Sequence, residues 1–138
     1  TLDYKLKFHL TAGKKIPIYE NIYLGDERNI RGYNPNPVLN HVNVREKLKF
    51  FNLILYSTEM NIPIYTNINF INKSYLFIFS DYGIGSNDYK NFDYKNKVNG
   101  YGFGLKLYNN KKNLIALSFG MNQYANKTIH IIFNQDIF

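Results

Sequence analysis

The sequence of 138 residues lacks cysteine, so it can form neither a disulfide framework nor a zinc site built from thiolates. It also lacks an apolar run of about 18 residues, and this absence excludes a transmembrane helix. A transmembrane β-barrel is not excluded, because its strands alternate between two faces and leave only a weak hydropathy signal. The length is enough for one domain.

Aromatic residues make up 17% of the chain, and all of them are phenylalanine or tyrosine. These residues and isoleucine favour strands, whereas asparagine and lysine do not, so we expect short strands separated by polar loops. The formal net charge of +7 has two interpretations. It indicates either an acidic partner, such as nucleic acid or anionic lipid, or only the residue bias of an AT-rich genome. The positive charges are spread over many loops, which favours the second interpretation.

Residues 2–12 alternate between apolar and polar side chains with a period of two, which predicts a β-strand. One face carries Leu2, Tyr4, Leu6, Phe8 and Leu10. The other face carries Asp3, Lys5, Lys7, His9 and Thr11. This polar face could line the water-filled lumen of a barrel whose apolar face contacts lipid, or it could be the solvated face of an ordinary sheet. The residue pattern of the strand alone does not distinguish these two possibilities.

Five further segments read as strands: residues 49–60, 67–81, 100–108, 114–121 and 128–138. We expect Ile62, Pro63 and Ile64 to end the first of them, because proline cannot donate to a ladder. We expect the turn-like sequence 81–85 to end the second, and a polar loop, 86–99, to follow it. In 100–108, glycine takes the small-residue face. The prediction is an all-β chain of about six antiparallel strands joined up and down.

An irregular segment of roughly thirty residues, 13–47, separates the first two predicted strands, and loops of that length are usually functional or disordered. Apolar residues within it argue against disorder, and its glycines allow close backbone approach. These residues are Leu24, Ile30 and Tyr33, together with Gly25 and Gly32. Arg31 lies between an aliphatic residue and Gly-Tyr, so we expect an anchored arginine that needs a carboxylate partner.

Residues 24–33 resemble a motif of the outer-membrane protein assembly superfamily, whose members include BamA, the two-partner secretion pores, the mitochondrial sorting-and-assembly barrel and the chloroplast import channel. That family has a (Val/Ile)-Arg-Gly-(Phe/Tyr) motif at the tip of a long loop between two barrel strands. The matching residues here are Ile30, Arg31, Gly32 and Tyr33. The family's preceding Leu-Gly-Gly-Glu is similar to Leu24, Gly25, Asp26 and Glu27, with Asp26 in place of the second glycine.

Two further motifs follow in the family's order. Residues 57–63 resemble its Ser-x-Glu-x-x-x-Pro, with Glu59 as the acid. Residues 79–83 resemble its Phe-x-Asp-x-Gly, with Phe79, Asp81 and Gly83. The resemblance implies that Asp81 and Glu59 lie on the inner wall of a barrel. There they would anchor Arg31, whose guanidinium can bridge a carboxylate through two parallel hydrogen bonds.

By this resemblance, residues 1–138 are the C-terminal portion of a transmembrane β-barrel, about the last six of sixteen strands, with a long loop folded inward. The upstream strands and the POTRA domains lie outside this sequence. The last strand departs from the family, because residues 134–136 stand where glycine is common.

The resemblance also implies an integral outer-membrane protein that inserts or translocates other proteins. The seam between its first and last strands opens, and a client strand adds at that edge. We expect no enzymatic activity, cofactor or metal. The expected partners are membrane lipid, client outer-membrane or imported proteins and the POTRA domains of the same polypeptide, and not nucleic acid.

The abundance of lysine, asparagine, isoleucine, tyrosine and phenylalanine is typical of an AT-rich genome of a eukaryotic parasite. It therefore favours the outer membrane of an organelle over that of a bacterium. Residues 101–120 resemble the chloroplast-type members, whereas the intact Phe-x-Asp-x-Gly at 79–83 is less typical of them. We therefore favour a plastid envelope, with the mitochondrial outer membrane second.

Two alternatives come from other classes. A soluble β-rich module that binds nucleic acid or carbohydrate would need clustered lysine and arginine with aromatics on one face. In this sequence the aromatic residues share a strand face with aliphatic residues, and the lysines lie on the opposite face. A barrel enzyme is disfavoured, because no serine lies in a nucleophile-elbow pattern. The three histidines, His9, His41 and His130, show no metal-ligand spacing.

Overall fold

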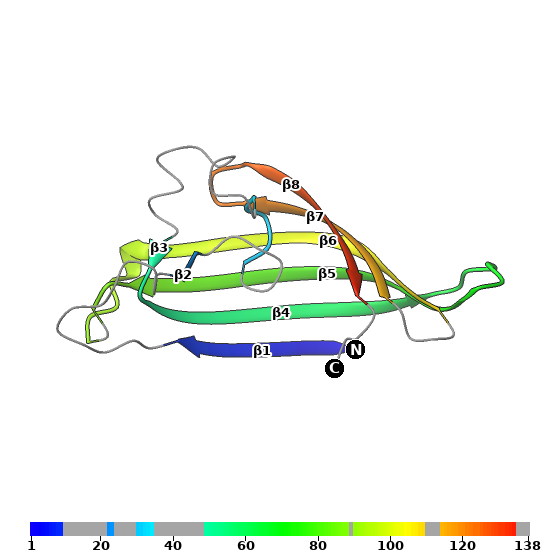
Figure 1. Ribbon diagram of the computed structural model, residues 1–138, viewed down its shortest axis with the longest axis horizontal. Helices are drawn as coiled ribbons and strands as arrows, with labels where there is room; N and C mark the ends of the chain where they lie inside the picture. Colours follow the sequence, from blue (N-terminus) through cyan, green and yellow to red (C-terminus); the bar gives the residue numbers. More distant parts are fainter. Residues whose placement is uncertain (10–21, 24–29, 35–48, 89, 110–113, 135–138) are drawn as a thin grey trace.

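The computed structural model of the protein describes residues 1–9, 22–23, 30–34, 49–88, 90–109 and 114–134. Its main element is a six-stranded sheet (Figure 1) made of β1 (Leu2–His9), β4 (Asn52–Ile64), β5 (Ile71–Ser86), β6 (Lys97–Asn109), β7 (Leu114–Asn122) and β8 (Lys127–Asn134). A two-stranded ribbon pairs β2 (Ile22–Tyr23) with β3 (Lys49–Phe50), and η3 (Tyr94–Asn96) is a short 3-10 turn. No helix in these ranges has the length and apolarity needed to cross a membrane.

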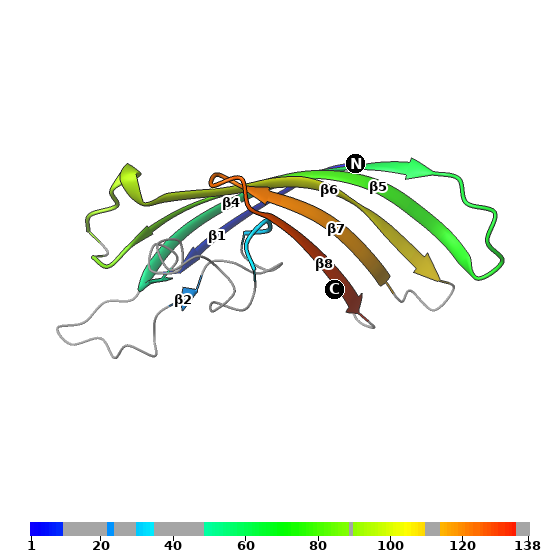
Figure 2. The same ribbon diagram turned by 90° about the horizontal axis from the view of Figure 1, so that it is seen from above.

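The six strands follow one another in the order β1-β4-β5-β6-β7-β8, and every neighbouring pair is antiparallel. The predicted up-and-down all-β architecture is therefore confirmed. Figure 2 shows that the sheet is arched and that residues 30–34 lie on its concave side. In the described part of the chain, β1 and β8 each pair with a single strand, so the sheet is open rather than closed into a barrel.

The convex face carries large apolar side chains on all six strands. One row of directly opposed residues crosses all six strands: Leu2, Met60, Ile78, Phe103, Phe119 and Ile129. Each of these side chains is 39–63% exposed. We call these six residues the convex row. The same face exposes further large apolar residues, including Leu6, Tyr56, Tyr101, Ile115 and Phe133. The strand predicted from the alternation of residues 2–12 is confirmed over β1, where Leu2, Tyr4, Leu6 and Phe8 are all exposed.

The concave face combines glycines with buried aromatic and polar side chains. Phe77, Phe79 and Asp81 of β5 are buried there. The next strand carries Gly100, Gly102 and Gly104 opposite them. The prediction that glycine takes one face of this strand is confirmed. Gly100 leaves room for the backbone of Arg31, whereas Gly102 and Gly104 leave room for the rings of Phe79 and Phe77.

The strand end expected at residues 62–64 is confirmed, but Pro63 does not interrupt the ladder as expected. β4 continues to Ile64, and Pro63 pairs with Tyr75 of β5. The backbone N–H of Asn61 donates to the carbonyl of Thr1, on the side of β4 away from β5, so the nitrogen of Pro63, two residues on, faces that same side. The ladder between β4 and β5 therefore loses no hydrogen bond at Pro63.

The turn expected at residues 81–85 is also wrong, because β5 runs straight through them to Ser86. Gly83 and Gly85 are needed in this strand because other side chains occupy the space that a Cβ would fill. A Cβ on Gly83 would lie 2.6 Å from Cδ1 of Ile30, and a Cβ on Gly85 would collide with the ring of Phe50. The glycines therefore mark close packing rather than a change of chain direction.

Other boundaries differ in smaller ways. The segment expected to be irregular contains β2, and the strand expected from residue 49 is interrupted at Phe51 between β3 and β4. The loop expected at 86–99 ends at Asn96, because β6 begins at Lys97. Residues 10–12 and 135–138 of the predicted strands lie outside the described residues.

The continuation of β5 past Asp81 can be tested by cross-linking, because the chain has no native cysteine. Ile54 and Ile84 are directly opposed on the convex face. Their Cα separation in such a pair suits a disulfide, whereas a diagonal pair is too far apart. We expect Ile54→Cys with Ile84→Cys to cross-link under mild oxidation, and Ile54→Cys with Tyr82→Cys not to, as read by gel mobility. Efficient cross-linking of the diagonal pair alone would contradict this register.

Candidate functional site

The candidate site lies where residues 30–34 cross the concave face of the sheet. Gly32 has a φ of +98°, in the region that favours glycine. A Cβ at this position would also lie 2.8 Å from the carbonyl oxygen of Met121. The side chain of Asn122 donates to the carbonyl of Gly32 at 3.0 Å. The backbone of this segment is thus pressed against β7, and only glycine fits the point of contact.

Arg31 binds Asp81 through three hydrogen bonds. Its Nε and Nη2 donate to Oδ2 and Oδ1 of Asp81, each at 2.8 Å, which is the bidentate fork typical of a guanidinium and a carboxylate. The backbone N–H of Arg31 donates to the same Oδ2 at 2.9 Å. The contact expected between these two residues is present. It joins the loop to the middle of β5 by both side chain and main chain.

The remaining edge of the guanidinium faces β4. Nη1 of Arg31 donates to Oε2 of Glu59 at 2.5 Å, and Nη2 donates to Oγ of Ser57 at 3.3 Å. Ser57 in turn donates to Asp81. The face of the guanidinium stacks on Phe79, with 3.8 Å between Cζ and the ring centroid. Two strands therefore supply both the charged and the aromatic contacts.

Lys106 of β6 extends this cluster. Its ammonium donates to Oε1 of Glu59 and, at 3.2 Å, to Oδ1 of Asn61. It also lies over the ring of Phe77, 4.7 Å from the centroid. Glu59 thus accepts from a different cation on each oxygen. Arg31, Lys106, Glu59 and Asp81 form what we call the ion cluster, with two positive and two negative charges.

The ion cluster is largely shielded from water. The side chains of Arg31, Glu59 and Lys106 are 12%, 15% and 19% exposed, and that of Asp81 is 1% exposed. Burial of Arg31 disfavours its charge, but the hydrogen bonds and charges of Asp81 and Glu59 outweigh this effect and raise the pKa of Arg31 above its ordinary value. The arginine therefore stays charged, and each buried charge has a partner.

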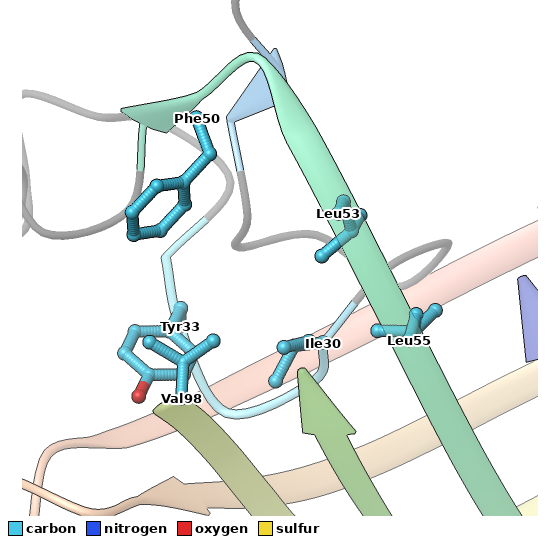
Figure 3. Close-up of a cluster of buried hydrophobic side chains, with 6 residues drawn as sticks. All are labelled: Ile30, Tyr33, Phe50, Leu53, Leu55 and Val98. Atoms are coloured by element: carbon cyan, nitrogen blue, oxygen red, sulfur yellow. The ribbon is translucent and has the colours of Figure 1, made fainter. Parts of the chain in front are cut away.

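Apolar contacts flank the ion cluster. Ile30 and Tyr33 are fully buried in a cluster (Figure 3) with Phe50, Leu53, Leu55 and Val98. Tyr124 packs against this cluster from the outside. A Cβ at Gly100 of β6 would collide with the carbonyl oxygen of Arg31. The segment is therefore held by charge at Arg31, by close backbone contact at Gly32 and by apolar packing on either side.

The structure brings together most of the residues that the sequence singled out. Ile30, Arg31, Gly32, Tyr33, Glu59, Phe79, Asp81 and Gly83 all belong to this site. Leu24, Gly25 and Glu27 lie outside the described residues. Lys106, Asn122 and Gly100 were not predicted. A signal existed for Lys106, because period-two alternation places it on the same face as the glycines of its strand.

The ion cluster is arranged so that it can anchor residues 30–34 to the sheet. Within the described ranges, no group of three or more histidine, cysteine, aspartate or glutamate residues could hold a metal ion. Both carboxylates of the ion cluster already accept hydrogen bonds from cations. Comparisons with protein-family models, curated proteins and solved structures found no match to this chain.

Replacement of Arg31 should release residues 30–34 from the sheet. Arg31→Ala leaves Asp81 buried without its cation, and breaking such a pair costs about 3–5 kcal/mol. Chymotrypsin cleavage after the buried Tyr33 reports the detached state, and its rate should rise by at least about 100-fold. Arg31→Lys should recover little, because an ammonium cannot form the fork.

A charge exchange provides the control for this prediction. Arg31→Asp with Asp81→Arg should recover only part of the loss, because an arginine at 81 cannot accept the backbone N–H that Asp81 accepts. Cleavage after Tyr33 at the same rate in Arg31→Ala and in the unaltered protein would show that the arginine does not hold the segment.

Lys106→Met should have a smaller effect of the same kind. Glu59 would keep Arg31 but lose the cation on its other oxygen, which costs on the order of 1–3 kcal/mol. We expect cleavage after Tyr33 to rise by about tenfold. Lys97→Met removes an exposed lysine of the same strand, which lies over Tyr94, and should leave the rate unchanged. Equal rates for the two lysine variants would rule out a role for Lys106 in the cluster.

Proposed function

We propose that this chain is part of an integral membrane β-barrel that inserts or translocates other proteins, with residues 30–33 as a loop anchored inside the barrel. The observation that carries this proposal is the opposed character of the two faces of the sheet. One face exposes an apolar row across all six strands, and the other buries a charge-neutral ion cluster beneath a loop. An exposed apolar surface of this extent marks an interaction site. A lipid bilayer can cover it without a protein partner of complementary shape.

The strand lengths support a membrane location. β4, β5 and β6 contain 13, 16 and 13 residues. A tilted strand needs about 9–11 residues to cross the hydrocarbon core. In lipid, unpaired backbone groups are costly, so the free edges of β1 and β8 require partners. We propose that further strands of the same barrel complete it, with POTRA domains elsewhere in the polypeptide.

The proposed mechanism uses strand pairing rather than bond chemistry. A seam next to β1 or β8 opens, and an edge strand of a client protein pairs with it through backbone hydrogen bonds. The anchored loop touches β4, β5, β6 and β7 at once, through Glu59, Asp81, Gly100 and Asn122. It therefore holds the arch of the central strands while the edges change partners. The proposed location is an organelle outer membrane, with a plastid envelope favoured over the mitochondrion.

The membrane location is tested by alkaline carbonate extraction of isolated membranes. We expect the protein to stay in the membrane pellet and to dissolve only with detergent. Phe103→Arg places a charge in the convex row and should reduce the inserted fraction, because an arginine on the lipid face costs about 2–4 kcal/mol near the midplane. Asn87→Arg, in an exposed loop, should have no effect. Recovery in the carbonate-soluble fraction would favour a soluble module that binds nucleic acid or carbohydrate.

The role of the anchored loop is tested separately. Arg31→Ala should lower the rate of client assembly while the protein stays in the carbonate pellet, because the loss is confined to the loop. Normal client assembly by a variant whose loop is demonstrably released would contradict the proposed role of the anchor and leave the membrane location intact.

A further inference from the structure

The hairpin between β4 and β5 ends in an unusually apolar turn. Residues 65–70, which we call the hairpin tip, project at one end of the sheet (Figure 1). Within the tip, Tyr65 is 92% exposed, Phe70 is 66% exposed and Ile68 is 44% exposed. Surface turns normally carry small polar residues, so three large apolar side chains on six residues need an explanation.

The hairpin tip is held in shape by hydrogen bonds. The N–H of Ile71 donates to the carbonyl of Ile68 at 2.9 Å. The hydroxyls of Thr66 and Ser74 lie 2.8 Å apart, and Ser74 donates to the carbonyl of Ile64 at 3.0 Å. The exposed apolar side chains of the hairpin tip therefore project from a turn whose backbone is fixed by hydrogen bonds.

The hairpin tip also lacks charge. Residues 60–72 contain no aspartate, glutamate, lysine, arginine or histidine. The connection between β5 and β6 provides the contrast, because it carries Asp88, Lys90, Asp93 and Lys95. The two connections that flank β5 thus differ in kind, because residues 65–70 are uncharged and residues 87–96 are charged.

We infer that the hairpin tip lies in the interfacial region of a lipid bilayer and anchors this end of the sheet there. The inference rests on the proposed membrane location. The apolar surface of the tip continues that of the convex face through Ile62, Ile64 and Leu76, each exposed and on the same side. One bilayer therefore covers both surfaces.

The composition of the tip fits the interface rather than the hydrocarbon core. A tyrosine places its ring among acyl chains and its hydroxyl among headgroups, which is why tyrosine is enriched at this depth. Asn67 and Asn69 are exposed beside it and supply polar groups at the same level. The absence of charge indicates contact with zwitterionic lipid, without a requirement for anionic headgroups.

Residues 1–138 contain no tryptophan, so once any tryptophan elsewhere in the polypeptide is replaced by phenylalanine, a single introduced tryptophan gives an unambiguous fluorescence signal. We would prepare Tyr65→Trp and Phe70→Trp separately, because both positions are exposed and accept a larger ring. Phe103→Trp in the convex row reports the hydrocarbon core, and Asn87→Trp in the charged connection reports water. Each full-length variant is reconstituted into phosphatidylcholine vesicles with lipids brominated either near the headgroup or deep in the acyl chain.

We expect both tip variants to emit at shorter wavelength than Asn87→Trp and to be quenched more by shallow than by deep bromine. Phe103→Trp should show the opposite preference. Replacing part of the phosphatidylcholine with phosphatidylglycerol should leave tip quenching unchanged.

Two other outcomes separate the claims. If Phe103→Trp is quenched by deep bromine while both tip variants respond only to aqueous iodide, as Asn87→Trp should, the tip does not enter the interface and the membrane proposal stands. If bromine at neither depth quenches Phe103→Trp, the membrane proposal fails and the inference fails with it.

Discussion

The buried guanidinium of Arg31 is the constraint on which the rest of the structure depends. A charge with 12% of its side chain exposed is tolerable only if it is neutralised at short range, and Asp81 and Glu59 do this from two strands. The position of the arginine then dictates its surroundings. Gly32 and Gly100 have no room for a Cβ, because the loop backbone lies against β6 and β7. The loop therefore constrains the residue type at Gly100 of the sheet, and the sheet constrains the residue type at Gly32 of the loop.

The second constraint is the division between the two faces. Because side chains alternate with a period of two, a one-residue slip in register would expose the ion cluster to the convex side and bury the convex row. Charge on one face and apolar surface on the other therefore specify the register jointly. This explains how long, glycine-containing strands, which pair weakly by themselves, are aligned over six strands.

The periodic strands and the Arg31–Asp81 contact could be predicted from the sequence, the first by alternation and the second by motif resemblance. What failed was local interpretation of glycine and proline. In the sequence, Gly83 and Gly85 indicate a turn. In the structure they are strand residues, and they are glycine because the side chains of Ile30 and Phe50 lie against them. Pro63 is tolerated because its nitrogen faces away from β5, and Lys106 joins the cluster through a partner 47 residues away. Such contacts are set by tertiary packing, which no local pattern encodes.

A double-mutant cycle on Arg31 and Asp81 tests the central claim most directly. The free energy of loop release would be measured from chymotrypsin cleavage after Tyr33 in Arg31→Ala, Asp81→Ala, the double variant and the unaltered protein. If the two side chains act as one anchor, the double variant is little worse than either single variant, so the coupling is close to the single-variant loss of about 3–5 kcal/mol. Additive effects, with no coupling, would contradict the account.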